Sequence, residues 1–233
     1  MEQNSQELRP GWVIARDEGR ELTWQQRLAE RTHGVVRLPN LMTATGVGLT
    51  ILSARYASQN KPVAATAAAV AGFGMDMEGS VARRFDVTDP VMGAKTDQVA
   101  DIIKATIVGS TLLSRGVMPR SAAALTYGPK LAGVSAGVVA KTAGRDLASS
   151  KLGKTAEVCR DAVPIAFLGA AIGEKLDKPR LAKTGRVAAW LAVGAAATVG
   201  TIAAVGYARE AAVAKKSVDL SARQGETLDH VEN

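Results

Sequence analysis

Residues 76–101 read DMEGSVARRFDVTDPVMGAKTDQVAD, and this polar stretch lies between segments rich in Ala, Val, Leu and Gly. Charged groups in apolar surroundings are costly unless they are paired or bound to a metal ion. The stretch is therefore the first place in the chain where we expect chemistry. Strand signals are nearly absent on either side of it, so the flanking segments predict an all-α fold.

Six apolar segments of helical length follow one another along the chain. They cover residues 38–54, 62–75, 102–113, 122–140, 162–173 and 187–208. Only the last reaches the roughly 20 residues that cross a bilayer, and Lys104 and Lys130 interrupt the third and fourth. Spans around a polar cavity would tolerate these charges, although a soluble Ala-rich bundle fits the same pattern. We interpret residues 38–208 as an integral membrane bundle of six transmembrane helices.

The composition narrows the classes of function. The 233 residues are 47% hydrophobic but only 4% aromatic, and the formal net charge is +7. Small residues suit closely packed membrane helices, and the positive charge favours anionic partners such as lipid or phosphorylated substrates. The single cysteine excludes an internal disulfide. With so few aromatic residues and no nucleic-acid motif, we expect no nucleic-acid partner.

The two ends of the chain are polar. In residues 1–37, Thr23 and Gln26 have the spacing of a helix capping box, and Trp24, Leu28 and Val35 would line one face of the following helix. We expect this N-terminal segment to carry an amphipathic helix at the membrane interface, although a surface helix of a soluble domain has the same features. Residues 209–233 are expected to form a polar cytoplasmic tail, as a short frayed helix followed by disorder.

The distribution of Lys and Arg predicts the orientation of the bundle. With the N-terminus in the cytoplasm, the segments placed inside carry about twice as many Lys and Arg as those placed outside, as the positive-inside rule expects. The basic loop of residues 175–186 falls outside and disagrees with the rule. The prediction is a multi-pass protein of the plasma membrane.

The second half of the central stretch has a regular helical spacing. Gly93, Asp97 and Asp101 stand at i, i+4 and i+8, so they share one face of a helix. Two carboxylates one turn apart repel unless a positive group lies between them, and a hard divalent cation with oxygen ligands is a natural occupant. Pairing of solvated carboxylates with nearby Lys or Arg is the alternative interpretation.

The first half of the stretch adds further acidic and small residues. Asp76, Gly79 and Arg83 stand at i, i+3 and i+7, and Glu78 lies between them. Gly79 leaves room for a bulky group near the backbone, and Arg83 suits a phosphate. Four carboxylates, two glycines and an arginine together suit a metal–diphosphate complex.

This order of residues resembles the signature of the CDP-alcohol phosphatidyltransferases, D-x-x-D-G-x-x-A-R, a spacer, then G-x-x-x-D-x-x-x-D. Here it covers Gly79, Ala82, Arg83, Gly93, Asp97 and Asp101. Residues 38–43, LPNLMT, resemble the P-N-x-L-T start of the family's first membrane helix, and the resemblance extends over roughly residues 38–208.

The resemblance implies an enzyme of phospholipid synthesis that transfers a phosphatidyl group from CDP-diacylglycerol to a small alcohol and releases CMP. It implies two divalent cations, Mg²⁺ or Mn²⁺, with ligands Asp76, Glu78, Asp97 and Asp101. By the same resemblance, Asp101 would also be the general base, and Gly79, Ala82, Arg83 and Gly93 would shape the CDP site. It further implies an active site facing the cytoplasm and a homodimer.

The chain departs from the signature at its first two acids. Met75 stands where the first aspartate belongs, Asp76 follows one place late, and Glu78 replaces the second aspartate. One place on a helix is a rotation of about 100°. A divergent enzyme is our interpretation. A membrane relative that has lost activity and acts as a scaffold, and a soluble helical binding protein, remain alternatives.

A basic segment predicts the acceptor site. Residues 148–155, ASSKLGKT, are similar to the S-x-x-G-K-x-K-T region of phosphatidylglycerophosphate synthases. Together Arg145, Lys151, Lys154 and Arg160 would bind a phosphorylated acceptor such as glycerol 3-phosphate. The basic bias of any cytoplasmic membrane loop is the alternative explanation.

Overall fold

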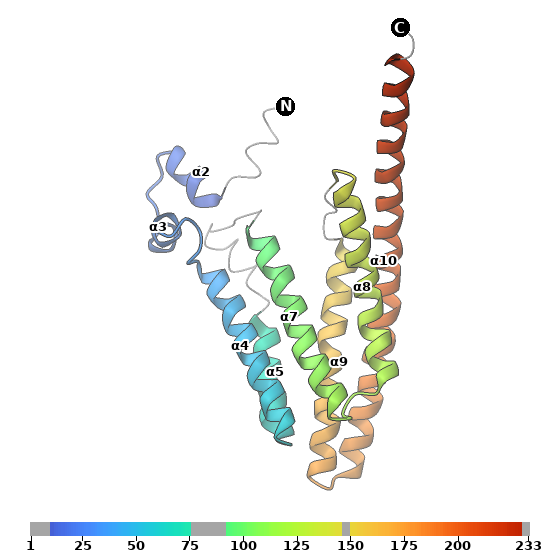
Figure 1. Ribbon diagram of the computed structural model, residues 1–233. Helices are drawn as coiled ribbons and strands as arrows, with labels where there is room; N and C mark the ends of the chain where they lie inside the picture. The colour runs from blue at the N-terminus through green and yellow to red at the C-terminus, as the bar shows by residue number, and fades with distance from the viewer. Residues whose placement is uncertain (1–9, 76–91, 146–149, 230–233) are drawn as a thin grey trace. The chain divides into compact units, whose positions relative to one another are not determined.

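The computed structural model describes residues 10–75, 92–145 and 150–229, with the backbone alone for 92–95, 97–98 and 217–229. These residues form eight helices and no strands (Figure 1), which confirms the all-α prediction. The chain divides into two compact units, Met1–Arg115 and Gly116–Asn233.

In the first unit, α4 is the central helix, packing against α5 and α7. The helices of this unit are α2 (Gly11–Asp17), α3 (Trp24–Arg31), α4 (Leu38–Ser58), α5 (Pro62–Gly74) and α7 (Met92–Ser114). Helices α4, α5 and α7 contain the first three apolar segments of the sequence. In α7 the helix begins well before residue 102, so it includes the second half of the polar stretch.

The capping box at the start of α3 is confirmed. The Thr23 hydroxyl accepts a hydrogen bond from the Gln26 N–H, and the Gln26 side chain accepts one from the Thr23 N–H. Trp24 lies on the surface with 69% of its area exposed. The helix ends at Arg31, so Val35 lies beyond it and does not share its face. Helix α2, which precedes it, was not predicted.

Small residues form the contact between α4 and α5. A Cβ atom on Gly46 would lie 3.0 Å from the Gly72 carbonyl oxygen, and one on Gly72 would lie 3.0 Å from the Thr50 hydroxyl. Ser53 donates a hydrogen bond to the Ala65 carbonyl across the same contact. The two backbones can approach this closely because Gly46 and Gly72 have no side chain at the contact.

The second unit consists of three long helices. These are α8 (Arg120–Thr142), α9 (Lys151–Lys175) and α10 (Pro179–Asp229), and α10 packs along both of the others (Figure 1). The contact between α8 and α10 is again built from small residues, with Ala136, Ala140 and Ala211 buried around Tyr207. Helix α10 continues unbroken past residue 208, so residues 209–229 extend a long helix instead of forming a short frayed one.

In the described helices, small apolar side chains are buried more often than large ones, which is unusual. Most of the buried hydrophobic residues are alanines, whereas many large apolar side chains are exposed. Leu131, Val158 and Leu191 are each about two-thirds exposed, at 67%, 71% and 70%. Leu and Val are among the residues most often buried in soluble proteins, whereas the described helices pack largely through small residues and expose many large apolar ones.

Candidate functional site

Helix α7 positions the regular half of the polar stretch. It runs without interruption over Met92–Ser114, so Gly93, Asp97 and Asp101 lie one turn apart along one helix, as their spacing predicted. The Asp101 side chain is 30% exposed. A carboxylate at this position is half-buried yet open to a ligand.

A buried lysine accompanies Asp101. The Lys104 ammonium lies 3.3 Å from Asp101 Oδ1, and the Lys104 side chain is only 3% exposed. A buried ammonium needs a counter-charge, and Asp101 supplies one at a distance of one turn. In the sequence Lys104 stood out only as an interruption of an apolar segment; the i, i+3 spacing from Asp101 was the signal for this pair.

The start of α9 carries two of the predicted acceptor cations. Lys151 and Lys154 are exposed in its first turn, and Arg145 is exposed shortly before it. Ser150 caps the helix, because its hydroxyl accepts the Gly153 N–H at 2.9 Å. These three cations are open to solvent and available to an anion.

Arg160, the fourth predicted acceptor residue, has a different environment. It is buried, and its guanidinium lies 3.5 Å from Glu157 Oε1. Nine residues after Lys151, it points about half a turn away around α9. Glu157 also contacts the Lys130 ammonium at 2.5 Å, which links α8 to α9. The structure therefore places Arg160 in a charge cluster between helices, apart from the exposed cations.

Tyr207 of α10 holds the start of α9 in place. Its hydroxyl accepts the Ser150 N–H at 2.9 Å and lies 3.2 Å from the Ser150 hydroxyl. A Cβ atom on Gly153 would come within 2.5 Å of the Tyr207 oxygen, so a larger residue at position 153 would require the Tyr207 side chain to move. Tyr207 was not singled out from the sequence, because its partner is 57 residues away.

The start of α4 is tied to the preceding turn. Arg37 is buried and donates to the Gly34 carbonyl at 2.7 Å and to the Asn40 side chain at 3.2 Å. Its guanidinium also lies 5.7 Å from the ring centre of Trp12, a cation–π distance. Asn40 in turn donates to the Val35 carbonyl at 2.9 Å. Within the LPNLMT segment, Asn40 thus fixes how the chain enters its first long helix.

Comparison with models of protein families shows which family the chain belongs to. The family model for CDP-alcohol phosphatidyltransferase matches residues 36–202, which is most of the chain. The chain belongs to the CDP-alcohol phosphatidyltransferase family. No curated protein and no solved structure matches it.

Membership makes the protein one of a family of phosphotransferases that act in phospholipid synthesis. Members of the family are membrane proteins. Among the described residues, one helical stretch, Pro179–Lys216 of α10, is long and apolar enough to cross a bilayer by length and composition.

The family generally depends on divalent cations, and the residues of this chain can be compared with that requirement. Asp76 and Glu78 lie outside the described residues, as do Gly79, Ala82 and Arg83, and only the backbone of Asp97 is described. In the described part of the chain, no three potential ligands gather around one point. The carboxylates at Asp97 and Asp101, one turn apart on α7, have the oxygen chemistry that Mg²⁺ and Mn²⁺ prefer. The donor chemistry on α7 therefore fits the family's cations.

Proposed function

We propose that this protein transfers a phosphatidyl group from CDP-diacylglycerol to a phosphorylated alcohol such as glycerol 3-phosphate and releases CMP. The observation that carries this proposal is the face of α7, where Gly93, Asp97 and Asp101 follow one another at single turns in a member of the family. The proposed cation ligands are Asp76, Glu78, Asp97 and Asp101. When bound, the two cations would neutralise the diphosphate and stabilise the CMP leaving group.

The proton transfer, the positioning of the base and the binding of CDP are assigned to residues of the chain. Asp101 would take the proton of the acceptor hydroxyl while that oxygen forms a bond to the phosphorus carrying the diacylglycerol. The bond from this phosphorus to the CMP oxygen breaks, and CMP leaves with the electron pair. Lys104, in contact with Asp101 Oδ1, would hold the carboxylate in position. Gly79, Ala82, Arg83 and Gly93 are proposed to shape the CDP site.

The acceptor phosphate would bind at the beginning of α9. Lys151, Lys154 and Arg145 are exposed there and carry three positive charges within a short segment. A phosphate monoester with a charge near −2 gains more from such a segment than a neutral alcohol does. Arg160, tied to Glu157, would act on this site through the packing of α9 against α8.

The surface of the helices supports a membrane location. Large apolar side chains face outward and small ones face the helix contacts, which is the arrangement expected where lipid replaces water. We propose six membrane spans formed by α4, α5, α7, α8, α9 and α10, with α3 at the interface. We also propose a homodimer in the plasma membrane, with the active site facing the cytoplasm.

The test is release of CMP from CDP-diacylglycerol by the purified full chain, with Mg²⁺ or Mn²⁺ and a panel of acceptors. We expect turnover with a phosphorylated acceptor and a loss of at least about 100-fold in Asp101→Asn, because the amide cannot accept the proton. Asp17→Asn makes the same chemical change at an exposed carboxylate of α2 and should leave turnover unchanged. No CMP release with any acceptor would instead favour a relative that has lost activity.

A further inference from the structure

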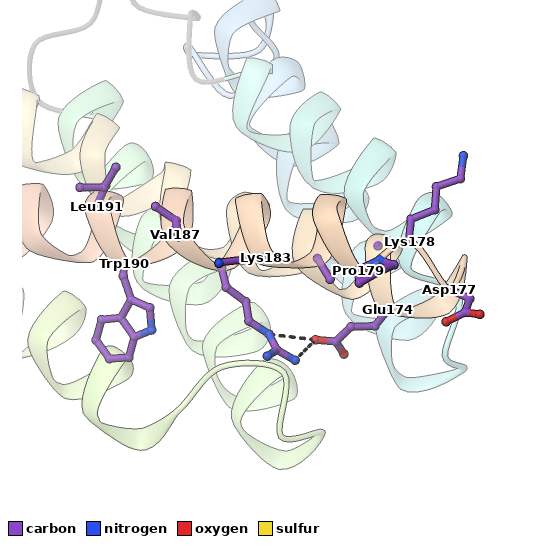
Figure 2. Close-up of a pocket in the computed structure, with 11 residues that line it drawn as sticks. Glu174, Asp177, Lys178, Pro179, Lys183, Val187, Trp190 and Leu191 are labelled. Carbon is purple, nitrogen blue, oxygen red and sulfur yellow. Dashed lines mark hydrogen bonds and ion pairs between the residues drawn. The ribbon is translucent and has the colours of Figure 1, made fainter.

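A pocket opens where α9 turns into α10, at the opposite end of α9 from Lys151. It has a volume of about 960 Å³ and is lined by the last turn of α9, the connecting turn and the first turns of α10 (Figure 2). The length of α9 separates this pocket from the proposed acceptor site by about 36 Å. It therefore belongs to a different part of the molecule.

Backbone contacts give the pocket fixed walls. A Cβ atom on Gly173 would collide with the backbone of Ala182, and one on Gly185 would collide with the backbone of Ala170. The two helices consequently touch without intervening side chains. Trp190 is held by an edge-on contact with Phe167, with ring centres 6.4 Å apart. These contacts define the walls of the pocket.

One face of α10 changes from charged to apolar along the pocket. Lys183, Val187 and Trp190 stand at i, i+4 and i+7, so they follow one another along that face. Leu191 continues the apolar part and is 70% exposed, while Trp190 is 44% exposed. This order matches a lipid whose charged headgroup lies beside Lys183 and whose acyl chain lies along Val187 and Trp190. A tryptophan where charged residues give way to apolar ones is typical of a membrane interface.

Three cations and two carboxylates line the pocket, so its net charge is +1: Lys178, Lys183 and Arg186 against Glu174 and Asp177. Arg186 is neutralised by Glu174, which accepts from Nη2 and Nε at 2.5 and 3.1 Å. Lys178 and Lys183 line the same pocket, are exposed, and make no ion pair with the residues that the structure describes. These two ammonium groups are available to an anionic group.

The position of the pocket along the chain agrees with a membrane boundary. The apolar run of residues 187–208 begins within the pocket lining, at Val187, and belongs to the helical stretch that is long and apolar enough to cross a bilayer. The loop of residues 175–186 is basic although it falls on the outer side in the predicted topology, where Lys and Arg are usually scarce. A ligand that requires positive charge would account for this exception.

We infer that the α9–α10 pocket binds an anionic phospholipid of the surrounding leaflet. The lipid phosphate contacts Lys183, Lys178 adds positive charge at the edge of the pocket, and an acyl chain lies along Val187, Trp190 and Leu191. This inference rests on α10 crossing the bilayer and is independent of the chemistry at Asp101. It assigns a function to the end of the α9–α10 hairpin that phosphatidyl transfer does not use.

The experiment titrates phosphatidylserine, and separately phosphatidylcholine, into the detergent-solubilised full chain and counts bound lipid by native mass spectrometry. We expect phosphatidylserine to bind more tightly than phosphatidylcholine. The double variant Lys178→Gln/Lys183→Gln should weaken phosphatidylserine binding by up to about 25-fold, because each lysine near a lipid surface contributes on the order of fivefold. Its binding of phosphatidylcholine should not change.

Two further variants test whether the lipid binds at this pocket or is attracted to positive charge anywhere on the protein. Lys215→Gln/Lys216→Gln removes two exposed lysines from the same helix and should retain the affinity for phosphatidylserine. Leu191→Asn, at an exposed position, should weaken binding through the acyl chain. Equal losses in the two lysine pairs, or no effect of Leu191→Asn, would overturn the inference. Displacement of phosphatidylserine by millimolar inorganic phosphate would also overturn it, since the site would then recognise phosphate alone.

Discussion

Lys104 places a positive charge beside the carboxylate that we assign as the general base. Its ammonium is buried and contacts Asp101 Oδ1 at 3.3 Å. A cation bound to Asp101 would therefore share that carboxylate with a second positive charge. At a separation of a few ångströms two such charges repel by an amount that affects metal affinity, even with the screening of a partly exposed site.

Lys104→Met keeps the length of the side chain and removes the charge. We expect the half-saturating Mg²⁺ concentration to fall several-fold, because a repelling charge is gone. We expect kcat to fall about tenfold at saturating Mg²⁺, because Asp101 is no longer held in position. Steady-state CMP release across a Mg²⁺ titration measures both quantities.

Lys104→Arg is the control for charge, and it should retain the Mg²⁺ requirement of the natural chain. A purely structural role for Lys104 would lower kcat or the melting temperature without making Mg²⁺ more effective. A higher Mg²⁺ requirement in Lys104→Met would contradict the assignment of Asp101 as a ligand of the cation.

At the scale of the elements, the start of α9 depends on a contact from α10. Tyr207→Phe keeps the ring against Ala136 and Ala211 but removes the oxygen that accepts the Ser150 N–H. We expect a loss of about 1 kcal/mol in stability, as for one hydrogen bond. The KM for the phosphorylated acceptor should rise several-fold because Lys151 and Lys154 are held less firmly, whereas the KM for CDP-diacylglycerol should not change.

Tyr56→Phe makes the same change on α4, in the other unit, and should leave both KM values unaltered. Hydrogen exchange of the amides at the start of α9 gives a second measurement, and faster exchange is expected in Tyr207→Phe. An equal rise in both KM values would show that the substitution disturbs the fold as a whole and would remove the specific role of Tyr207.

The elements also show what the sequence can predict. The apolar segments located α4, α5, α7, α8, α9 and α10, because helical periodicity and composition are local properties. The spacing of Asp97 and Asp101 was likewise read correctly as one helical face. The contact of Tyr207 with Ser150 was not predictable, because it depends on how α10 packs against α9. The sequence predicted only a short frayed helix after residue 208, and the length of α10 was underestimated because that segment is polar and hydropathy alone does not distinguish a polar helix from a tail.

At the scale of the molecule, the described helices have small residues at their contacts and large apolar residues outside. Water would oppose this arrangement because it exposes large side chains and gains little from burying alanine. In a bilayer the arrangement is not unfavourable, because lipid solvates leucine and valine as well as a protein interior does. The distribution of side-chain size therefore supports a bundle of membrane helices in a way that the mean hydropathy of +0.05 does not.

The proposed six-span arrangement has a direct consequence for the two ends of α9. This helix is about 36 Å long, enough to cross the roughly 30 Å of a bilayer's hydrocarbon core. The end of α8 and the α9–α10 turn should then lie on opposite sides of the membrane.

In a Cys159→Ser background, which removes the chain's one natural thiol, Thr142→Cys and Arg180→Cys each introduce a thiol at an exposed site near one end of α9. A membrane-impermeant maleimide should label the Arg180→Cys chain in intact cells and the Thr142→Cys chain only after the membrane is opened. The reversed pattern would invert the topology and place the basic 175–186 loop in the cytoplasm, and protection of both thiols until cells are opened would contradict a crossing by α9.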